Sequence, residues 1–540
     1  MKNTNSSLKE TFAKAVLAYN KKDLKAAEVI CNKILSINPN HFDSINLLAN
    51  ISVSNSNFKE AKRLLIQAIE IKPKNIRLLN NLGTACRHLG DLKSAVSYYQ
   101  KGIDIDDNNA SAYYNLGAIY YDLKKLNEAK KNLEKSISIE KNFALPLFVL
   151  GNVCKDLKDY KSAIDYYQKS IKINDKLVSA HNNLGLVFRI LNNFKSAIAC
   201  YEKAIKTKPD HVGAYHNLAL ALKEVGKFDE AIKSHETAIK YEPENLTHYF
   251  YLSNLKKDIL NSDLKKKIEK VIQNHTLKSN IAYGNFLLAK YEQKEKNYEK
   301  ELDFLIKGHQ NYFDTRKAQF EIMVKYSFND MLQISNNVEV NKSDKKNKKN
   351  EINPIFIIGV PRCGSTLVEK ILGSGEKLFP MGEETAIIEE FVTAKILKKQ
   401  SLNLGEAESI REEICKVYKE RGLISQKHNN IFTDKSLNNF FFLNLLKSIF
   451  PNAKIINCRR DVLSSIMSIF QNNLTELAWA HNLENIFKYF DNYFTIIKKY
   501  QETNPNFIYE LNFEKLSNNP EEESKKLMKF CELPWDKKCL

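Results

Sequence analysis

The chain has 540 residues, of which 82 are Lys or Arg and 64 are Asp or Glu, so its formal charge at pH 7 is +18. This length exceeds that of one ordinary hydrophobic core, and an apolar content of 43% excludes an intrinsically disordered chain. The charge favours an anionic ligand or an acidic partner, although a solvated lysine-rich surface explains it equally well. Nucleic-acid binding has no support in the sequence other than the net charge, so no nucleic-acid partner is expected.

Targeting and membrane features are not expected in this chain. Residues 1–23 contain no continuous apolar segment of signal-peptide length, and no run of about 18 apolar residues occurs anywhere. The nine cysteines are scattered and no histidine cluster stands out, which argues against a disulfide framework and against a structural zinc site. The sequence therefore predicts a cytoplasmic chain without a membrane span and without a metal.

The N-terminal half contains an internal repeat. A small residue recurs at an interval of 34 residues, at Ala15, Ala49, Gly83, Gly117, Gly151, Gly185, Ala219 and Ser253. An alanine follows 12 positions after each of the first seven, at Ala27, Ala61, Ala95, Ala129, Ala163, Ala197 and Ala231. Proline closes several repeats, at Pro39, Pro73, Pro209 and Pro243. This pattern predicts about seven tetratricopeptide repeats (TPR) over residues 8–245, stacked into an all-α solenoid.

A solenoid of this type presents a concave groove to other proteins. We therefore expect the TPR groove to recruit an acceptor protein or peptide, and the positive net charge favours an acidic one. Several aromatic side chains suit either the groove lining or the packing between helices, and packing is the expectation for most of Tyr113, Tyr114, Tyr166, Tyr167, Tyr201 and Tyr215.

Two transitional segments follow the repeats. The helical pattern weakens over residues 246–335, where the sequence around Asn297 resembles the remnant of another repeat, so this segment is predicted to be a helical cap and connector. Residues 336–353 are polar and rich in lysine and have no apolar face, which is typical of a linker. A second domain is predicted to begin at residue 354.

Short apolar runs alternate with helical patterns over residues 354–540. The predicted strands are 355–360, 431–433, 454–458 and 507–511, and the predicted helices are 365–373, 384–397, 406–422, 437–449, 461–471, 483–503 and 520–531. This alternation predicts an α/β domain with a parallel sheet flanked by helices. Ligands of such sheets bind at the carboxyl ends of the strands.

The first of these strands leads into a loop suited to an anion. Gly359 and Gly364 have the spacing of a nucleotide phosphate loop, but Ser365 occupies the position of the phosphate-binding lysine. Backbone N–H groups at the start of the following helix attract anions, and Arg362 adds a forked cation. Cys363 at this position is either a reactive thiol of lowered pKa or, as we favour, a small residue that fills the loop.

These residues resemble a known family. The segment Pro361-Arg362-Cys363-Gly364-Ser365-Thr366 resembles the 5′-phosphosulfate-binding loop of sulfotransferases that use 3′-phosphoadenylyl sulfate (PAPS). The whole arrangement is similar to bacterial TPR-containing sulfotransferases, and residues from 354 onward are similar to protein-tyrosine sulfotransferases. The resemblance implies a P-loop-like sulfotransferase fold in which Arg362, Cys363, Gly364, Ser365 and Thr366 bind PAPS and Arg362 also assists catalysis.

Further motifs follow in the order that this family has. The run Gly382-Glu383-Glu384-Thr385 implies that Glu383 is the catalytic base, although glutamates at a helix start also compensate the helix dipole. In Thr433-Asp434-Lys435-Ser436 the resemblance implies a catalytic Lys435 that contacts the leaving group. Arg460 and Ser468 correspond to the residues that bind the 3′-phosphate, and Leu533-Pro534-Trp535-Asp536 resembles a late structural signature of the family.

The match to tyrosine sulfotransferases has departures. Phe513 stands where they have a cofactor-contacting Tyr, Asn472 stands where they have an Arg, and the sequence ends at Leu540, before the expected C-terminal tail. The leading hypothesis is a PAPS-dependent sulfotransferase that acts on a protein tyrosine. Its alternatives are a sulfotransferase for a glycan or small-molecule hydroxyl, an inactive TPR scaffold, and a P-loop kinase or NTPase, which Ser365 disfavours.

Overall fold

The computed structural model describes all residues except 1, 275, 342–351, 376–378, 400–401 and 425–430. The chain divides into two compact units, Met1–Pro243 and Glu244–Leu540. Most of the predicted linker, residues 342–351, lies outside the described residues. The predicted cap, residues 246–335, lies within the second unit.

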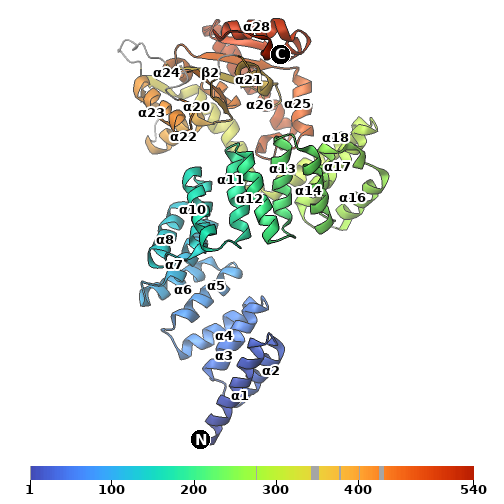
Figure 1. Cartoon of the computed structure of the whole chain (residues 1–540). Helices are drawn as coiled ribbons and strands as arrows, with labels where there is room; N and C mark the ends of the chain where they lie inside the picture. Colours follow the sequence, from blue (N-terminus) through green and yellow to red (C-terminus); the bar gives the residue numbers. More distant parts are fainter. Residues whose placement is uncertain (1, 275, 342–351, 376–378, 400–401, 425–430) are drawn as a thin grey trace. The chain divides into compact units, whose positions relative to one another are not determined.

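The described part of the first unit consists of fourteen helices that form consecutive antiparallel pairs (Figure 1). They are α1 (Lys2–Asn20), α2 (Leu24–Ile37), α3 (Phe42–Ser54), α4 (Phe58–Ile71), α5 (Ile76–His88), α6 (Leu92–Ile105), α7 (Ala110–Asp122), α8 (Leu126–Ile139), α9 (Ala144–Asp156), α10 (Tyr160–Ile173), α11 (Val178–Ile190), α12 (Phe194–Thr207), α13 (Val212–Glu224) and α14 (Phe228–Tyr241). The predicted TPR solenoid is confirmed.

Side-chain packing explains the 34-residue period. A Cβ at Gly151 would lie 2.5 Å from the ring of Tyr167, and one at Gly185 would lie 2.7 Å from the ring of Tyr201. Both tyrosines are fully buried, so the prediction that they pack between helices is confirmed. Asp and Asn side chains cap the second helix of several repeats, as Asp23 does for α2 and Asn57 for α4. Each such cap stabilises its helix by about 1 kcal/mol.

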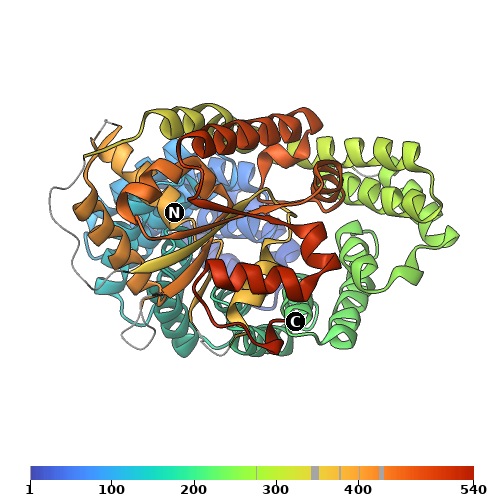
Figure 2. The same cartoon turned by 90° about the horizontal axis from the view of Figure 1, so that it is seen from above.

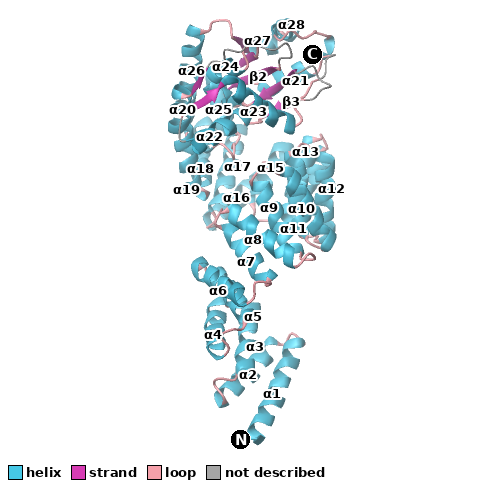
Figure 3. Cartoon of the chain, turned by 90° about the vertical axis from the view of Figure 1, so that its left-hand side faces the viewer, coloured by secondary structure: helices cyan, strands magenta, loops and turns pink. Residues whose placement is uncertain are grey.

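The second unit begins with helices and ends with an α/β layer (Figures 2 and 3). Its first helices are α15 (Leu246–Leu255), η1 (Lys257–Ile259), α16 (Ser262–Asn274), α17 (Lys278–Lys294), α18 (Tyr298–Thr315), α19 (Lys317–Lys325), the π-turn η2 (Tyr326–Asp330) and α20 (Met331–Asn337). The strands are β1 (Glu339–Asn341), β2 (Asn353–Gly359), β3 (Met381–Glu383), β4 (Asn403–Glu406), β5 (Ile431–Lys435), β6 (Lys454–Arg459) and β7 (Ile508–Asn512). The remaining helices are α21 (Ser365–Gly373), α22 (Ile387–Lys399), α23 (Ala407–Glu420), η3 (Leu437–Phe442), α24 (Leu443–Ile449), α25 (Val462–Gln471), η4 (Ala478–His481), α26 (Leu483–Thr503), α27 (Phe513–Asn518), α28 (Pro520–Phe530) and η5 (Lys537–Cys539).

Five parallel strands form the main sheet in the order β3-β5-β2-β6-β7, and β1 pairs with β4 in a separate two-stranded sheet. All four predicted strands are confirmed, whereas β1, β3 and β4 were not predicted, because each has only three or four residues. The apolar run of β2 lies at the centre and is buried on both faces, which accounts for its continuous Ile and Phe residues. Since the strands are parallel, the segments that follow β2, β3, β5 and β6 all lie at one edge of the sheet.

A buried histidine pair joins the helical part of this unit to the α/β layer. The Nδ1 atoms of His309 on α18 and His481 in η4 are 2.9 Å apart, and His309 Nε2 donates to the carbonyl oxygen of Phe470 at 2.6 Å. Burial lowers the pKa of His309 to about 4. It lowers the pKa of His481 to about 3, helped by the charges of His309 and Arg316.

These histidines predict acid sensitivity of the second unit. Between pH 7 and pH 5 the unfolded chain takes up protons at its free histidines while the native pair stays neutral, so the free energy of unfolding should fall by about 2 kcal/mol per histidine. Both tryptophans, Trp479 and Trp535, lie in this unit, so urea unfolding followed by tryptophan fluorescence reports on it. His481→Phe, which keeps the ring stacking on Phe320, should reduce the pH dependence by about half. An unchanged slope would contradict this account.

Candidate functional site

The loop between β2 and α21 provides an anion-binding helix start. Gly364 adopts φ +92° immediately before Ser365, the first residue of α21, and no side chain among the described residues caps this helix. A Cβ on Gly364 would lie 2.8 Å from Cε2 of Phe513, so only glycine lets the loop approach α27 this closely. The first-turn N–H groups of α21 and the positive end of the helix dipole are suited to a phosphate or sulfate oxygen.

Lys435, at the end of β5, lies among oxygen atoms beside this helix start. Its side chain is 2% exposed, and its Nζ donates to Thr366 Oγ1 at 3.0 Å and to Glu383 Oε1 at 2.5 Å. Strand pairing explains the second contact, because Glu383 of β3 lies opposite Lys435 of β5. The loop has Ser365 in the lysine position of a nucleotide loop, and Lys435 supplies a cation there from the neighbouring strand.

Glu369 is a part of this cluster that the sequence analysis missed. Its Oε2 lies 3.4 Å from Lys435 Nζ, and its Oε1 accepts a hydrogen bond from Thr433 Oγ1 at 2.9 Å. The residue is 4% exposed, and burial raises the pKa of its carboxyl group. A signal existed in the sequence, because Glu369 interrupts the otherwise apolar stripe of α21 that includes Val368 and Leu372. The Glu369 carboxylate contacts the ammonium group of Lys435 from the buried side.

A second buried carboxylate, Asp434, fixes the turn after β3. It is fully buried and accepts hydrogen bonds from Thr385 Oγ1 at 2.9 Å, from Ser436 Oγ at 2.6 Å and from the hydroxyl of Tyr418. Ser436 Oγ also accepts from the backbone N–H of Ala386. This network holds the turn in which Glu384 has φ +45°. The helix predicted to start at residue 384 therefore begins only at Ile387, because the strained turn precedes it.

The two arginines predicted to bind anions lie beside the loop. Arg362 Nε donates to Ser468 Oγ of α25 at 3.0 Å, and Arg460 Nη1 donates to the carbonyl oxygen of Arg362 at 3.3 Å. The guanidinium of Arg460 also lies 5.2 Å from the ring centre of Phe513. Arg459 instead pairs with Glu510 at 3.3 Å. The two guanidinium groups of Arg362 and Arg460 therefore lie close together, and the hydroxyl of Ser468 accepts a hydrogen bond from one of them.

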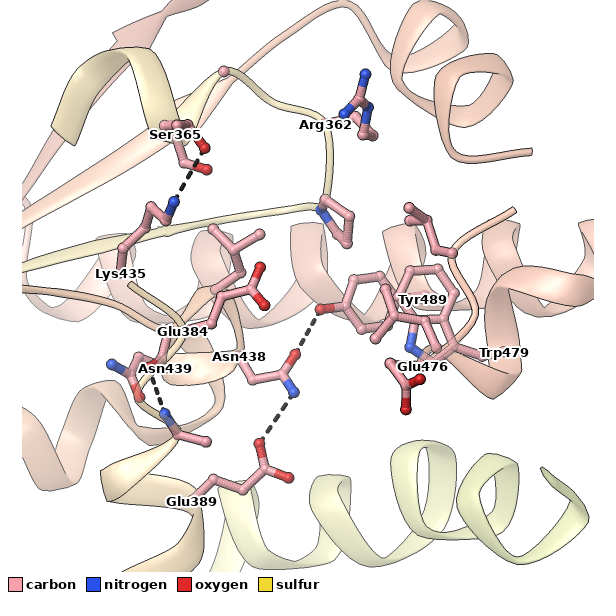
Figure 4. Close-up of a pocket in the computed structure, with 18 of the residues that line it drawn as sticks. Arg362, Ser365, Glu384, Glu389, Lys435, Asn438, Asn439, Glu476, Trp479 and Tyr489 are labelled. Atoms are coloured by element: carbon pink, nitrogen blue, oxygen red, sulfur yellow. Dashed lines mark hydrogen bonds between the residues drawn. The ribbon is translucent and has the colours of Figure 1, made fainter. Parts of the chain in front are cut away.

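A cavity of about 730 Å³ opens at this edge of the sheet (Figure 4). Its lining includes Arg362, Gly364, Ser365, Thr366, Lys435 and Arg460, six of the nine residues predicted to form the site. Glu383 touches Lys435 but Glu384 is the glutamate of this pair that lines the cavity. Ser468 reaches the cavity through Arg362, whereas the side chain of Cys363 is buried against β6, away from the lining.

Comparison with known proteins agrees with this arrangement. Residues 354–537 match the sulfotransferase family, and tetratricopeptide repeats match at 42–75, 83–124, 108–176, 178–211 and 200–233. An uncharacterized protein of Aquifex aeolicus (strain VF5) is 30% identical over 287 residues, which cover 49% of this chain and 36% of that protein. The chain thus spans about a third of the length of that relative.

Solved structures also resemble part of the chain. The crystal structure of MamA is 31% identical, with a TM-score of 0.29, and covers 30% of this chain and 95% of MamA. YrrB, described as a TPR protein with an unusual peptide-binding site, is 22% identical, with a TM-score of 0.30, and covers 34% of this chain and 95% of YrrB. None of the described helices of this chain has the length and apolarity needed to span a bilayer.

The family matches and the fold lead to the same conclusion: this chain joins a tetratricopeptide-repeat solenoid to a C-terminal domain of the sulfotransferase family.

Proposed function

We propose that the C-terminal domain transfers the sulfuryl group of PAPS to an acceptor hydroxyl, with a protein tyrosine as the first choice of acceptor. The observation that carries this proposal is the convergence of the uncapped α21 start, Lys435 and Arg460 on one cavity at the carboxyl edge of the sheet. A glycan or small-molecule hydroxyl is the rival acceptor, because a shared domain does not determine the substrate.

The residues present fit both charged ends of PAPS. The first-turn amides of Ser365 and Thr366, together with Arg362, would hold the phosphosulfate. Arg460 and Ser468 would hold the 3′-phosphate, since a guanidinium and a hydroxyl can bond the same phosphate from two sides. Cys363 would contribute to the loop through its backbone. PAPS supplies the sulfuryl group and PAP is the leaving group.

Two side chains would act during transfer. Lys435 neutralises the charge that develops on the phosphate oxygen as its bond to sulfur breaks. Glu383 accepts the proton of the acceptor hydroxyl as the acceptor oxygen bonds to sulfur, and its hydrogen bond from Lys435 holds this carboxylate in place. Proton, sulfuryl group and leaving group are all accounted for, and no metal is invoked.

A calorimetric titration of the full chain with PAP tests this function. We expect micromolar PAP binding, far weaker binding of Mg²⁺-ATP, and a loss of about 10- to 100-fold in PAP affinity for Arg460→Ala, which removes charge-assisted hydrogen bonds. Arg459→Ala is the matched control, because Arg459 pairs with Glu510, and its PAP affinity should change less than about twofold. Absence of PAP binding would leave an inactive TPR scaffold as the better account, and tight Mg²⁺-ATP binding would favour an NTPase.

We further propose that the solenoid recruits an acidic partner. A surface cavity of about 750 Å³ between α8 and α10 is lined by three lysines, Lys141, Lys169 and Lys172, and one carboxylate, Glu134, around Tyr166 and Ile137. Lysines around an apolar floor suit an acidic peptide. Calorimetric titration of the full chain with hexaglutamate checks this proposal. Hexaglutamate should bind, and replacement of the three lysines by glutamate should abolish its binding.

A further inference from the structure

The proposed reaction cavity continues into a second, smaller chamber. This chamber has a volume of about 250 Å³ and shares with the main cavity Glu389, Asn438, Glu476, Leu477, Trp479 and Tyr489. Its outer wall is Met323, Tyr326, Ser327 and Met331, from α19, the π-turn η2 and α20. The helical segment interpreted from sequence as a cap therefore contributes part of the wall. Its π-turn η2 lines the chamber, and turns of this kind are frequent at functional sites.

The charged side chains that line the chamber, among the described residues, are two carboxylates. Glu389 and Glu476 line both spaces, and no Lys or Arg is found in the lining of the smaller one among the residues that the structure describes. No salt bridge joins either carboxylate to a described cation. Figure 4 shows Arg362 and Lys435 on one side of the cavity and Glu389 and Glu476 on the other. Arg362, Arg460 and Lys435 thus lie on the donor side, whereas Glu389 and Glu476 line the side that remains for the acceptor.

An aromatic pair and an amide hold Glu389 in place. Trp479 stacks on Tyr489 with ring centres 4.0 Å apart. The Tyr489 hydroxyl donates to Asn438 Oδ1 at 2.8 Å, and Asn438 Nδ2 donates to Glu389 Oε2 at 3.1 Å (Figure 4). A carboxylate beside aromatic rings, without a cation of its own, is complementary to a positively charged ligand group.

Unpaired amides provide an independent sign of a ligand in the same cavity. Asn473 is 6% exposed and lines the main cavity, yet neither its Oδ1 nor its Nδ2 has a hydrogen-bond partner among the described residues. Its backbone adopts φ +36°. Asn439, which is 1% exposed, likewise has an unpaired Nδ2. Buried amides without partners are rare, and a ligand hydroxyl, which both donates and accepts, would satisfy Asn473.

We propose that the acceptor is a hydroxyl compound that carries a protonated amine or guanidinium. Its hydroxyl would lie toward Lys435 and Glu383, and its cation would lie between Glu389 and Glu476. The inference rests on the proposed sulfuryl transfer and adds the charge of its acceptor. Two sources share this chemistry, a small phenolic amine and a tyrosine next to basic residues. Acidic groups of a protein acceptor would bind to the solenoid and not to this cavity.

Phenols that share an ethyl linker and differ in the charge of its terminal group test the inference. Tyramine, 4-ethylphenol and 3-(4-hydroxyphenyl)propionate are titrated into the PAP-saturated full chain, and Lys-Tyr-Lys and Asp-Tyr-Asp peptides distinguish the two sources. We expect the cationic member of at least one set to bind about 10-fold or more tighter than its acidic counterpart, with the neutral phenol intermediate. Glu389→Gln/Glu476→Gln, which keeps the size and the hydrogen bond to Asn438, should abolish this preference and leave PAP binding intact. Glu484→Gln, an exposed site on α26, is the matched control and should keep the preference.

Two results would overturn the inference: no cationic compound binds better than its neutral or acidic counterpart, or the preference survives in the double variant. Both leave the proposed function standing, because PAP binding is measured first in the same sample. Loss of PAP binding in the unmodified chain would instead refute the proposed function itself.

Discussion

Lys435→Met is expected to lower the turnover number of sulfuryl transfer by about 10²- to 10³-fold, because it removes the preorganised cation at the leaving oxygen. It should also lower the free energy of unfolding of the second unit by about 3 kcal/mol, since Glu369 would stay buried without its cation. Product formation from PAPS measures the first effect, and urea unfolding followed by tryptophan fluorescence measures the second.

The double variant Lys435→Met/Glu369→Gln separates the two effects. Replacing the buried carboxylate by an amide removes the uncompensated charge, so most of the lost stability should return while turnover stays low. Glu383→Gln provides the converse case, because the side chain of Glu383 is 53% exposed. Its stability should change little, yet turnover should fall with PAP binding retained, as expected for loss of the base. Recovery of turnover in the double variant would contradict the role of Lys435.

Gly364→Ala is expected to weaken PAP binding by about 10²-fold. The added methyl group would meet the ring of Phe513, so the loop must move away from α27, and a displacement of this kind misaligns the first-turn amides of α21. Calorimetric titration with PAP measures the loss, and the unfolding curve shows whether the domain stays folded.

Gly422→Ala is the matched control for this substitution. Gly422 has φ +77°, also in the left-handed region, but a Cβ there would meet nothing within 4 Å. Both variants should therefore lose about 1 kcal/mol of stability through backbone strain, and only Gly364→Ala should lose PAP affinity. Equal PAP affinity of the two variants would show that the close approach of Gly364 to Phe513 is not needed for binding.

Sequence reasoning recovered the features that depend on local pattern. The 34-residue period predicted the solenoid because the glycines of the series each face a bulky partner within their own repeat, as Gly151 faces Tyr167. The central strands were predictable because a strand buried on both faces is a continuous apolar run. The loop before α21 was recognisable because its glycines and Arg362 lie within a few residues of one another.

The sequence did not reveal how separate segments complete the site. Glu383 was proposed as the base from its motif, but the cavity lining includes Glu384, since the turn held by Asp434 orients the two glutamates differently. Glu369 was overlooked because a single acidic residue in an apolar stripe has no partner visible in sequence. Its partner, Lys435, is 66 positions away, at the end of strand β5.

By itself, the sequence determined that this protein is a helical repeat array followed by an α/β domain with an anion-binding loop, because repeat period, strand burial and loop chemistry are local properties. Tertiary structure alone decided which charges share the cavity. The strand order β3-β5-β2-β6-β7 puts Lys435 beside Thr366 and Glu383. The packing of η2 against the α/β layer adds Tyr326 to an acidic chamber. These contacts depend on which distant segments become neighbours in the fold, and no local sequence pattern specifies that.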